Sequence, residues 1–551
     1  MPVIKEYGIY VAYPPTVDLR AEGLGRYLAA FLKGSEGRSD VRFTIVCPSW
    51  SNDSLEELFD SEGVPKDRFR VVGPRGKPYV LYAYEAWKAY QQRDRSSGRL
   101  KHIGRAIAAG VTQAQTRLGR RAVQVNSVST LLLFCIEALP MAGLFLLLAP
   151  IWVPIVLVNR WTAIFRGSIR RVTPKVAAKK NRLKALLDQP QGIGFVQRLF
   201  ADMEQTETQR MQRVIERLRG VSAWYCPAAF WPAFNQIKAP RLMCVPDVVL
   251  TDFPVGFSSV NGDYTLQVFE NVEKAIADSD NLVAYSGAIK WGTLVDRYGV
   301  DEDKVSVIYH APNKLDRSVT VTGFPDPEKA SKNYCRSILS QAFLKGENID
   351  YLAGIKNGDV QFLFYASQFR PNKNILSLLR AYEYLLRSRH VSLKLILTGN
   401  PRHMPEIQDF IVQHRLEEEV LCLPKLSVDE LAACYKLATL AVNPSLSEGG
   451  CPFTFTEALS VGTPVVMAKI PVSQEVLTDP VLQELTFFDP YDWKDMAERI
   501  QWGVANREKL LAVQLPTYEQ LVQRTWQDVV NEHLDILDRM VSQRGAAEGI
   551  S

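Results

Sequence analysis

The sequence alternates between short apolar runs typical of strands and longer amphipathic stretches typical of helices, in two separate series. The first series has expected strands at 7–13, 42–47, 69–72, 221–226, 241–245, 282–286 and 305–309. The second has expected strands at 360–366, 393–397, 420–423, 440–443 and 465–467. Strand, turn and helix in succession indicate parallel sheets with crossover helices. We therefore expect an α/β chain of two doubly wound, Rossmann-like domains that bind a ligand between the carboxyl ends of their strands.

The length of 551 residues agrees with more than one hydrophobic core. The two series are interrupted by stretches of different character, which set the expected boundaries. These boundaries give a first Rossmann-like domain from 1–74 and 221–315, a basic helical insertion at 75–220, a linker at 316–357 and a second Rossmann-like domain at 358–517. Residues 518–551 follow as a long amphipathic helix, from about 518 to 540, and a tail. We expect this helix to pack back on the first domain.

Composition narrows the class of protein. An apolar fraction of 47% and a charged fraction of 23% are ordinary for a folded chain and exclude wholesale disorder, collagen and a multi-span transporter. The eight cysteines are scattered, without a C-x-x-C pair, so we expect neither a disulfide scaffold nor a structural zinc site. The amino-terminal residues lack the pattern of a signal peptide, and we expect a cytoplasmic location.

The insertion is strongly basic and surrounds one long apolar run. Residues 75–184 hold about twenty Lys and Arg against three acidic residues. Residues 128–158 contain one charge, Glu137, and three prolines. A single membrane crossing would place the two halves of the first sheet on opposite sides of the bilayer. The basic residues on both flanks of the run also argue against it, because positive residues stay on the cytoplasmic side.

A hairpin bent near residues 140–143 satisfies both constraints. Each leg, about 13–16 residues or roughly 20–24 Å, is too short to cross a bilayer comfortably. We expect the hairpin to enter one leaflet while the basic flanks bind anionic lipid head groups. The residues expected to contact the membrane are Leu131, Phe134, Leu144, Phe145, Trp152, Arg120, Arg121 and Arg160. A buried pair of core helices is the alternative; nucleic-acid binding is disfavoured, because so long an apolar run does not suit a phosphate backbone.

The segment 445–466, SLSEGGCPFTFTEALSVGTPVV, carries the most chemical information. Glu448 and Glu457 flank a glycine-containing turn that leads into a helix expected to begin near Phe453. Backbone N–H groups at a helix start favour anions. Two carboxylates beside them can accept hydrogen bonds from sugar or ribose hydroxyls.

This segment resembles the E-x7-E signature of retaining glycosyltransferases of family 4, which have the GT-B fold. The two glutamates are nine residues apart in this chain instead of eight, so the turn holds one extra residue. The resemblance implies that Glu448 acts in catalysis and that Glu457 binds the nucleotide-sugar donor. It covers most of residues 5–50 and 221–540.

Other motifs follow in the family's order. The segment 366–374, ASQFRPNKN, resembles the element whose Arg and Lys hold the donor diphosphate, and Arg370 and Lys373 fit those positions. The segment 245–254, VPDVVLTDFP, resembles the acceptor-side H-D element, with Pro246 in place of the histidine and Asp247 retained. Further donor-binding residues implied by the resemblance are Gly23, Gly25, Gly399 and Lys425. Ser286 matches a serine before a helix that it can cap, and His310 is expected to be a packing residue.

The resemblance implies a metal-independent hexosyltransferase that retains the anomeric configuration. The donor is expected to be a GDP- or UDP-linked sugar, with mannose as one candidate, and no cofactor is expected. The position of the hairpin favours an acceptor at the cytoplasmic face of the membrane, such as a lipid-linked saccharide in surface polysaccharide or glycolipid synthesis. The alternatives are another GT-B enzyme, such as a phosphorylase or a nucleotide-sugar epimerase, and a non-catalytic membrane scaffold. The oligomeric state stays open.

Overall fold

The computed structural model describes residues 4–82 and 195–548, apart from short breaks at 16, 18, 20–22, 80, 254–255, 258–262, 347–350, 353, 356–357 and 402–403. The chain divides into two compact units, one made of Met1–Gly76 with Glu204–Ser551 and the other of Lys77–Met203. Nearly all of the second unit, including the expected membrane hairpin and its contact residues, lies outside the described residues. The first unit contains both predicted sheets.

The first sheet has seven parallel strands in the order β3-β2-β1-β4-β5-β6-β7. Its strands are β1 (Lys5–Tyr10), β2 (Val41–Val46), β3 (Phe69–Val72), β4 (Val221–Cys226), β5 (Arg241–Val245), β6 (Leu282–Ala284) and β7 (Val305–Val307). Most of these residues are buried, because helices cover both faces of a parallel sheet. The strand sequences are therefore nearly continuous apolar runs. We call this part of the chain the first lobe.

The second sheet has six parallel strands in the order β10-β9-β8-β11-β12-β13, and we call it, with its helices, the second lobe. Its strands are β8 (Phe362–Tyr365), β9 (Lys394–Leu397), β10 (Val420–Cys422), β11 (Leu440–Asn443), β12 (Val465–Ala468) and β13 (Phe487–Phe488). Two separate apolar cores lie against it, one on each face. The predicted doubly wound architecture is therefore confirmed, with β13 as a strand that the sequence did not reveal.

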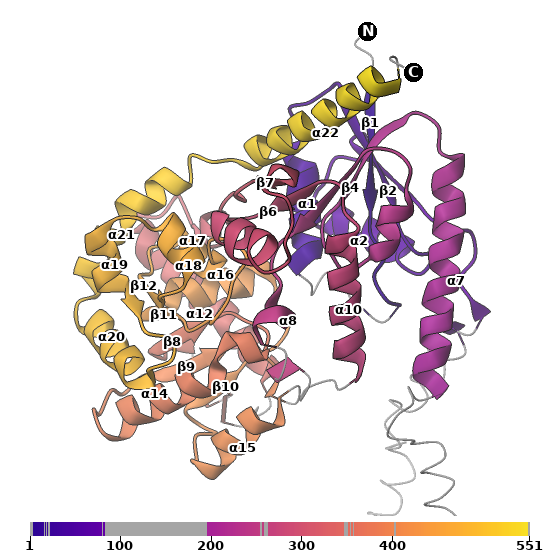
Figure 1. Ribbon diagram of the computed structural model, residues 1–551. Helices are drawn as coiled ribbons and strands as arrows, with labels where there is room; N and C mark the ends of the chain where they lie inside the picture. Colours follow the sequence, from indigo (N-terminus) through magenta and orange to yellow (C-terminus); the bar gives the residue numbers. More distant parts are fainter. Residues whose placement is uncertain are drawn as a thin grey trace, which may run out of the picture. The chain divides into compact units, whose positions relative to one another are not determined.

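The helices of the described residues connect and cover these strands (Figure 1). In the first lobe they are α1 (Gly23–Gly34), α2 (Asn52–Ser61), the part of α7 (Phe195–Arg217) from Glu204 onward, α8 (Val249–Asp252) and α10 (Asp263–Ala277). In the second lobe they are α11 (Asp316–Val319), α12 (Pro327–Ala342), α14 (Ile375–Arg387), α15 (Pro405–Gln413), α16 (Val428–Leu437), α17 (Phe453–Ser460), α18 (Pro471–Val476), α19 (Pro480–Thr486), α20 (Trp493–Ala505) and α21 (Arg507–Leu521). The last helix, α22 (Trp526–Glu548), packs against α1 and β4 of the first lobe.

The segment 316–357, expected to be a linker, instead contributes α11 and α12 to the second lobe. The Asp326 side chain accepts a hydrogen bond from the backbone N–H of Lys329, and Pro327 occupies the first turn of α12. The buried face of α12 consists of Ser331, Cys335, Leu339 and Ala342. Three of these four side chains are small, which obscures the helical period in the sequence, and the Asp-Pro pair at the start is also typical of a turn.

The helix predicted from about residue 518 to 540 is interrupted. α21 ends at Leu521 and α22 begins at Trp526, because Thr525 starts a new helix. The backbone N–H of Asp528 donates to Thr525 Oγ1 over 3.3 Å, and the N–H of Thr525 donates to the Asp528 carboxylate over 2.8 Å. This reciprocal pair is a capping box, so the sequence T-x-x-D held the signal for the break.

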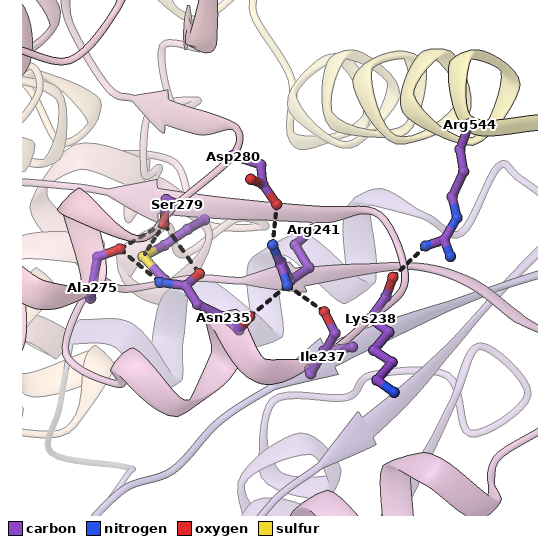
Figure 2. Close-up of polar contacts among 9 residues, drawn as sticks. Asn235, Ile237, Lys238, Arg241, Ala275, Ser279, Asp280 and Arg544 are labelled. Carbon is purple, nitrogen blue, oxygen red and sulfur yellow. Dashed lines mark hydrogen bonds and ion pairs between the residues drawn. The ribbon is translucent and has the colours of Figure 1, made fainter. Parts of the chain in front are cut away.

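The far end of α22 is fixed at the amino ends of the first lobe's strands (Figure 2). The guanidinium of Arg241, the first residue of β5, bonds to Asp280 and to the carbonyls of Asn235 and Ile237. Arg544, in α22, donates to the carbonyl of Lys238. The Arg544 bond therefore joins the helix to the lobe at the edge of the sheet opposite to the carboxyl ends of the strands, next to the loop that Arg241 braces.

A buried histidine in α22 predicts a pH dependence of stability. His533 is fully buried against the rings of Phe31 and Tyr225, and burial lowers its pKa to about 4. Between about pH 6.5 and 4 the unfolded chain binds a proton that the folded chain does not, so stability falls on acidification by up to about 1.4 kcal/mol per pH unit. Urea unfolding at pH 7 and pH 5 should show a smaller loss in His533→Leu than in wild type. The control is His390→Asn, because His390 is exposed and has a left-handed backbone conformation that asparagine also tolerates. Equal pH slopes in wild type and His533→Leu would show that His533 is not the source of the pH dependence.

Candidate active site

An ion pair lies where the carboxyl ends of two neighbouring strands, β8 and β11, meet. Lys373 Nζ is 2.5 Å from Glu448 Oε1, and both side chains are 19% exposed. Lys373 ends a short turn before α14, and Glu448 lies in the loop between β11 and α17. Hydrogen bonds between the two loops, from the N–H of Leu446 to the carbonyl of Asn372 and from the Asn372 amide to the carbonyl of Ser447, hold them in register.

The electrostatics of this pair keep the lysine charged. Burial alone would lower the pKa of Lys373, but the charges of Glu448 and Asp247 outweigh burial and raise it. Beneath the pair, the hydroxyl groups of Tyr365 and Ser445 lie 3.2 Å apart. The result is a fixed cation at the carboxyl edge of the second sheet.

Asp247 of the first lobe lies beside the same pair. It follows β5, and burial raises the pKa of its carboxyl group, while Lys373 and Arg370 act in the opposite direction. Arg370 is exposed and donates from Nη2 to Gln368 Oε1 over 2.7 Å. The structure therefore brings the four residues predicted to be catalytic, Arg370, Lys373, Glu448 and Asp247, into one group of two cations and two carboxyls.

The turn between the two glutamates begins with a glycine pair that touches the first lobe. A Cβ atom on Gly449 would lie 1.6 Å from the backbone oxygen of Pro246, and one on Gly450 would lie 2.5 Å from Nε2 of His310. Ser286 donates to the carbonyl of Gly449 over 2.9 Å and also caps the helical turn that follows it. The absence of side chains at both positions lets the Glu448 loop approach Asp247.

Glu457 lies apart from the ion pair, on α17. It is buried and accepts a hydrogen bond of 3.2 Å from the amide of Asn313. Burial raises the pKa of Glu457, while Asn313 and the charge of Arg26 lower it. Arg26 follows Gly25 in α1, so the start of α1 lies within electrostatic reach of Glu457. Sequence reasoning missed Asn313 and Arg26, whose positions depend on how the lobes meet.

The remaining predicted donor-binding residues have different surroundings. Gly25 is tightly packed, since a Cβ atom there would lie 2.1 Å from the carbonyl oxygen of Leu19, whereas Gly23 has open space around it. Gly399 lies under the ring of Phe369. The side chain of Lys425 is exposed, and its carbonyl accepts a hydrogen bond of 3.0 Å from Lys345 Nζ.

A carboxylate that the sequence did not single out joins the lobes. Glu475, in α18, accepts hydrogen bonds from the N–H groups of Gly287 (2.7 Å) and Ala288 (2.8 Å) and from the hydroxyl of Tyr309 (2.6 Å). Glu475 also lines a cavity of about 320 Å³, together with residues that include His310 and Cys451. The ring of His310 packs between Tyr285 and Phe453, as expected of a packing residue.

Two features are missing from the part of the chain that the structure describes. Over residues 4–82 and 195–548, outside the short breaks, no three His, Cys, Asp or Glu side chains are grouped so as to hold a metal ion. Within the same residues, no helix combines the length and the apolar character needed to traverse a bilayer.

The second lobe matches a known protein family. Residues 353–517 match the family described as glycosyl transferases group 1. Arg370, Lys373, Glu448 and Glu457 all lie inside this stretch. The match covers the sequence from just before β8 to α21, so the second lobe is similar to glycosyl transferases group 1.

Two curated proteins resemble part of the chain. The O-antigen chain mannosyltransferase RfbU of Salmonella typhimurium is 28% identical over 210 residues, which are 38% of this chain and 47% of that protein. A D-inositol 3-phosphate glycosyltransferase of Paenarthrobacter aurescens is 24% identical over 248 residues, 44% of this chain and 54% of that protein. The chain thus spans about half the length of the curated relatives it matches.

Solved structures share the two-lobed fold at low identity. Sucrose-phosphate synthase of Thermosynechococcus elongatus aligns with a TM-score of 0.55 and 10% identity, covering 98% of this chain and 100% of that one. The Anabaena protein HepE, solved with UDP and glucose, aligns with a TM-score of 0.52 and 12% identity, covering 97% and 100%. The fold is GT-B, as predicted.

Proposed function

We propose that the chain is a retaining hexosyltransferase that uses a nucleotide sugar. The observation that carries the proposal is the group of Lys373, Glu448, Arg370 and Asp247 where the two lobes touch. When the glycosidic bond of a nucleotide sugar breaks, negative charge grows on the departing diphosphate and positive charge on the sugar. A site built for this step needs fixed cations beside the diphosphate and carboxylates beside the sugar.

Each residue has a distinct role in this proposal. Lys373 and Arg370 bind the diphosphate, and their charges serve in place of a catalytic metal. Glu448, held by Lys373 in this structure, accepts hydrogen bonds from the sugar hydroxyls once the diphosphate takes over the lysine. Asp247, whose pKa burial raises, faces the acceptor hydroxyl and accepts its proton. Glu457 binds the ribose of the donor.

The names of the relatives support the choice of donor class. RfbU is named as a mannosyltransferase, and HepE was solved with UDP and glucose. We propose a hexose donor linked to GDP or UDP, with mannose as the first candidate. Thermal shift with GDP-, UDP- and dTDP-sugars identifies the nucleotide, and mass spectrometry of the products distinguishes the reaction. A free epimer or a sugar phosphate would favour another GT-B enzyme, and donor binding without any transfer would favour a non-catalytic scaffold.

We further propose that the acceptor is a lipid-linked saccharide at the cytoplasmic face of a membrane. The support is the basic and apolar insertion around residues 128–158, which interrupts the lobe expected to bind the acceptor. Flotation of the full chain with vesicles containing anionic lipid should recover more protein than flotation of a chain lacking residues 125–160. Equal recovery of the two chains would contradict the membrane hairpin.

A further inference from the structure

An aromatic group lies at the carboxyl edge of the first sheet. The loop after β4 carries Phe230 and Trp231, and Tyr13 follows β1. The ring of Trp231 lies edge-on to Tyr13, with centroids 5.3 Å apart, and to Phe230, with centroids 6.4 Å apart. The indole of Trp50, after β2, donates to the carbonyl of Tyr13 over 2.9 Å. Edge-to-face packing and this hydrogen bond hold the group in place.

The group exposes one ring. Phe230 is 41% exposed, whereas Trp231 and Trp50 are each 9% exposed. A half-exposed Phe offers on the order of 100 Å² of apolar surface. That area matches one face of a pyranose ring, and it is too small for the length of a polyprenyl or acyl chain.

The topology places the loop that carries this ring on the same edge of the sheet as the loop that carries Asp247. β4, which leads to Phe230, is the immediate neighbour of β5, which leads to Asp247. Neighbouring strands are about 4.8 Å apart, close to the width of one sugar ring. The edge that carries both residues is the one that meets the Glu448 loop, since Gly449 lies against Pro246.

The chemistry of the surface fits an acceptor sugar better than the donor. The donor's diphosphate requires the charged groups of the second lobe, whereas the exposed ring of Phe230 offers an apolar face only. A pyranose presents C–H groups on its face and hydroxyls at its rim, so it can stack on a ring while its hydroxyls stay in water. We propose that Phe230, supported by Trp231 and Tyr13, stacks against a pyranose ring of the acceptor. This proposal rests on the function proposed above. It specifies that the reacting end of the acceptor is a saccharide.

Binding measured without turnover tests the proposal. In saturation-transfer NMR, methyl α-mannopyranoside, methyl α-glucopyranoside and octyl α-mannopyranoside serve as probes with the full chain. Ring C–H protons should receive saturation from wild type, and the signal should fall about 10-fold in Phe230→Ala. Phe230→Trp should retain it, because the stacking surface remains. Phe324→Ala, which removes a 59%-exposed ring from the second lobe, is the matched control and should not change the signal.

The possible results separate this proposal from the proposed function. No ring saturation in wild type, equal signals in wild type and Phe230→Ala, or saturation confined to the octyl chain would each overturn the stacking role. Ring saturation that depends on Phe230 in a chain that transfers no sugar would support the stacking role and contradict the hexosyltransferase. If the wild-type chain transfers sugar, Phe230→Ala should raise the KM for the acceptor about 10-fold and leave the KM for the donor unchanged.

Discussion

Replacing Lys373 with alanine is expected to lower the rate of donor turnover by about 10²- to 10³-fold. The amino group lies 2.5 Å from Glu448, and in the proposed reaction it stabilises the charge that grows on the departing diphosphate. Its removal leaves the diphosphate without one of its two cations and leaves Glu448 without its partner. The measurement is the initial rate of nucleoside diphosphate release from the donor that the thermal-shift screen identifies.

Lys394 provides a matched control in the same lobe. It forms an ion pair of 2.7 Å with Glu419, with side chains 20% and 31% exposed, but it begins β9 and so lies at the opposite edge of the sheet. Lys394→Ala should keep close to the wild-type rate. If Lys373→Ala and Lys394→Ala lose activity equally, or if the loss in Lys373→Ala follows its thermal unfolding, the proposed role of Lys373 is wrong.

Replacing Gly449 with alanine should disrupt transfer without removing a charged group. The new methyl carbon would lie 1.6 Å from the backbone oxygen of Pro246, so the Glu448 loop and the Asp247 loop must move apart. We expect kcat to fall about 100-fold, because an ångström-scale misplacement of reacting groups has an effect of that size. Affinity for the nucleoside diphosphate alone should change little, since Lys373 and Arg370 belong to the second lobe.

Gly292→Ala is the control for this substitution. Gly292 lies in the first lobe, with no atom within 4 Å of the position of an added Cβ, and it should tolerate alanine. Steady-state kinetics and calorimetric titration of the nucleotide separate the two effects. Wild-type kcat in Gly449→Ala would show that close approach of the two loops is not needed for the reaction.

The strands were predictable because parallel strands buried on both faces have continuous apolar sequences. β4, β5 and β11 begin and end at the predicted residues. β13 has only two residues, too few for a pattern, and α12 buries small side chains that weaken its period. The break between α21 and α22 depends on one capping pair, which the apolar period of the whole segment obscured.

The candidate site was predictable to the extent that motifs follow strand ends. Lys373 and Glu448 follow neighbouring strands of one sheet, so topology alone brings them close. Contacts between the lobes cannot be predicted in this way, because strand order within one sheet does not determine how two lobes meet. Glu475 bonds to the N–H groups of Gly287 and Ala288, and Asn313 bonds to Glu457, only because the lobes meet in one particular way. The need for glycine at position 450 likewise depends on the other lobe, because a Cβ atom there would meet the ring of His310.

A crystal structure of the chain with its nucleoside diphosphate bound would show whether Lys373, Arg370 and Glu457 form the donor site. We expect the diphosphate to lie within hydrogen-bond distance of Lys373 and Arg370, Lys373 to have left Glu448 for a phosphate oxygen, and Glu457 to contact the ribose. A nucleotide bound elsewhere, with the Lys373–Glu448 pair unchanged, would show that these residues do not bind the donor.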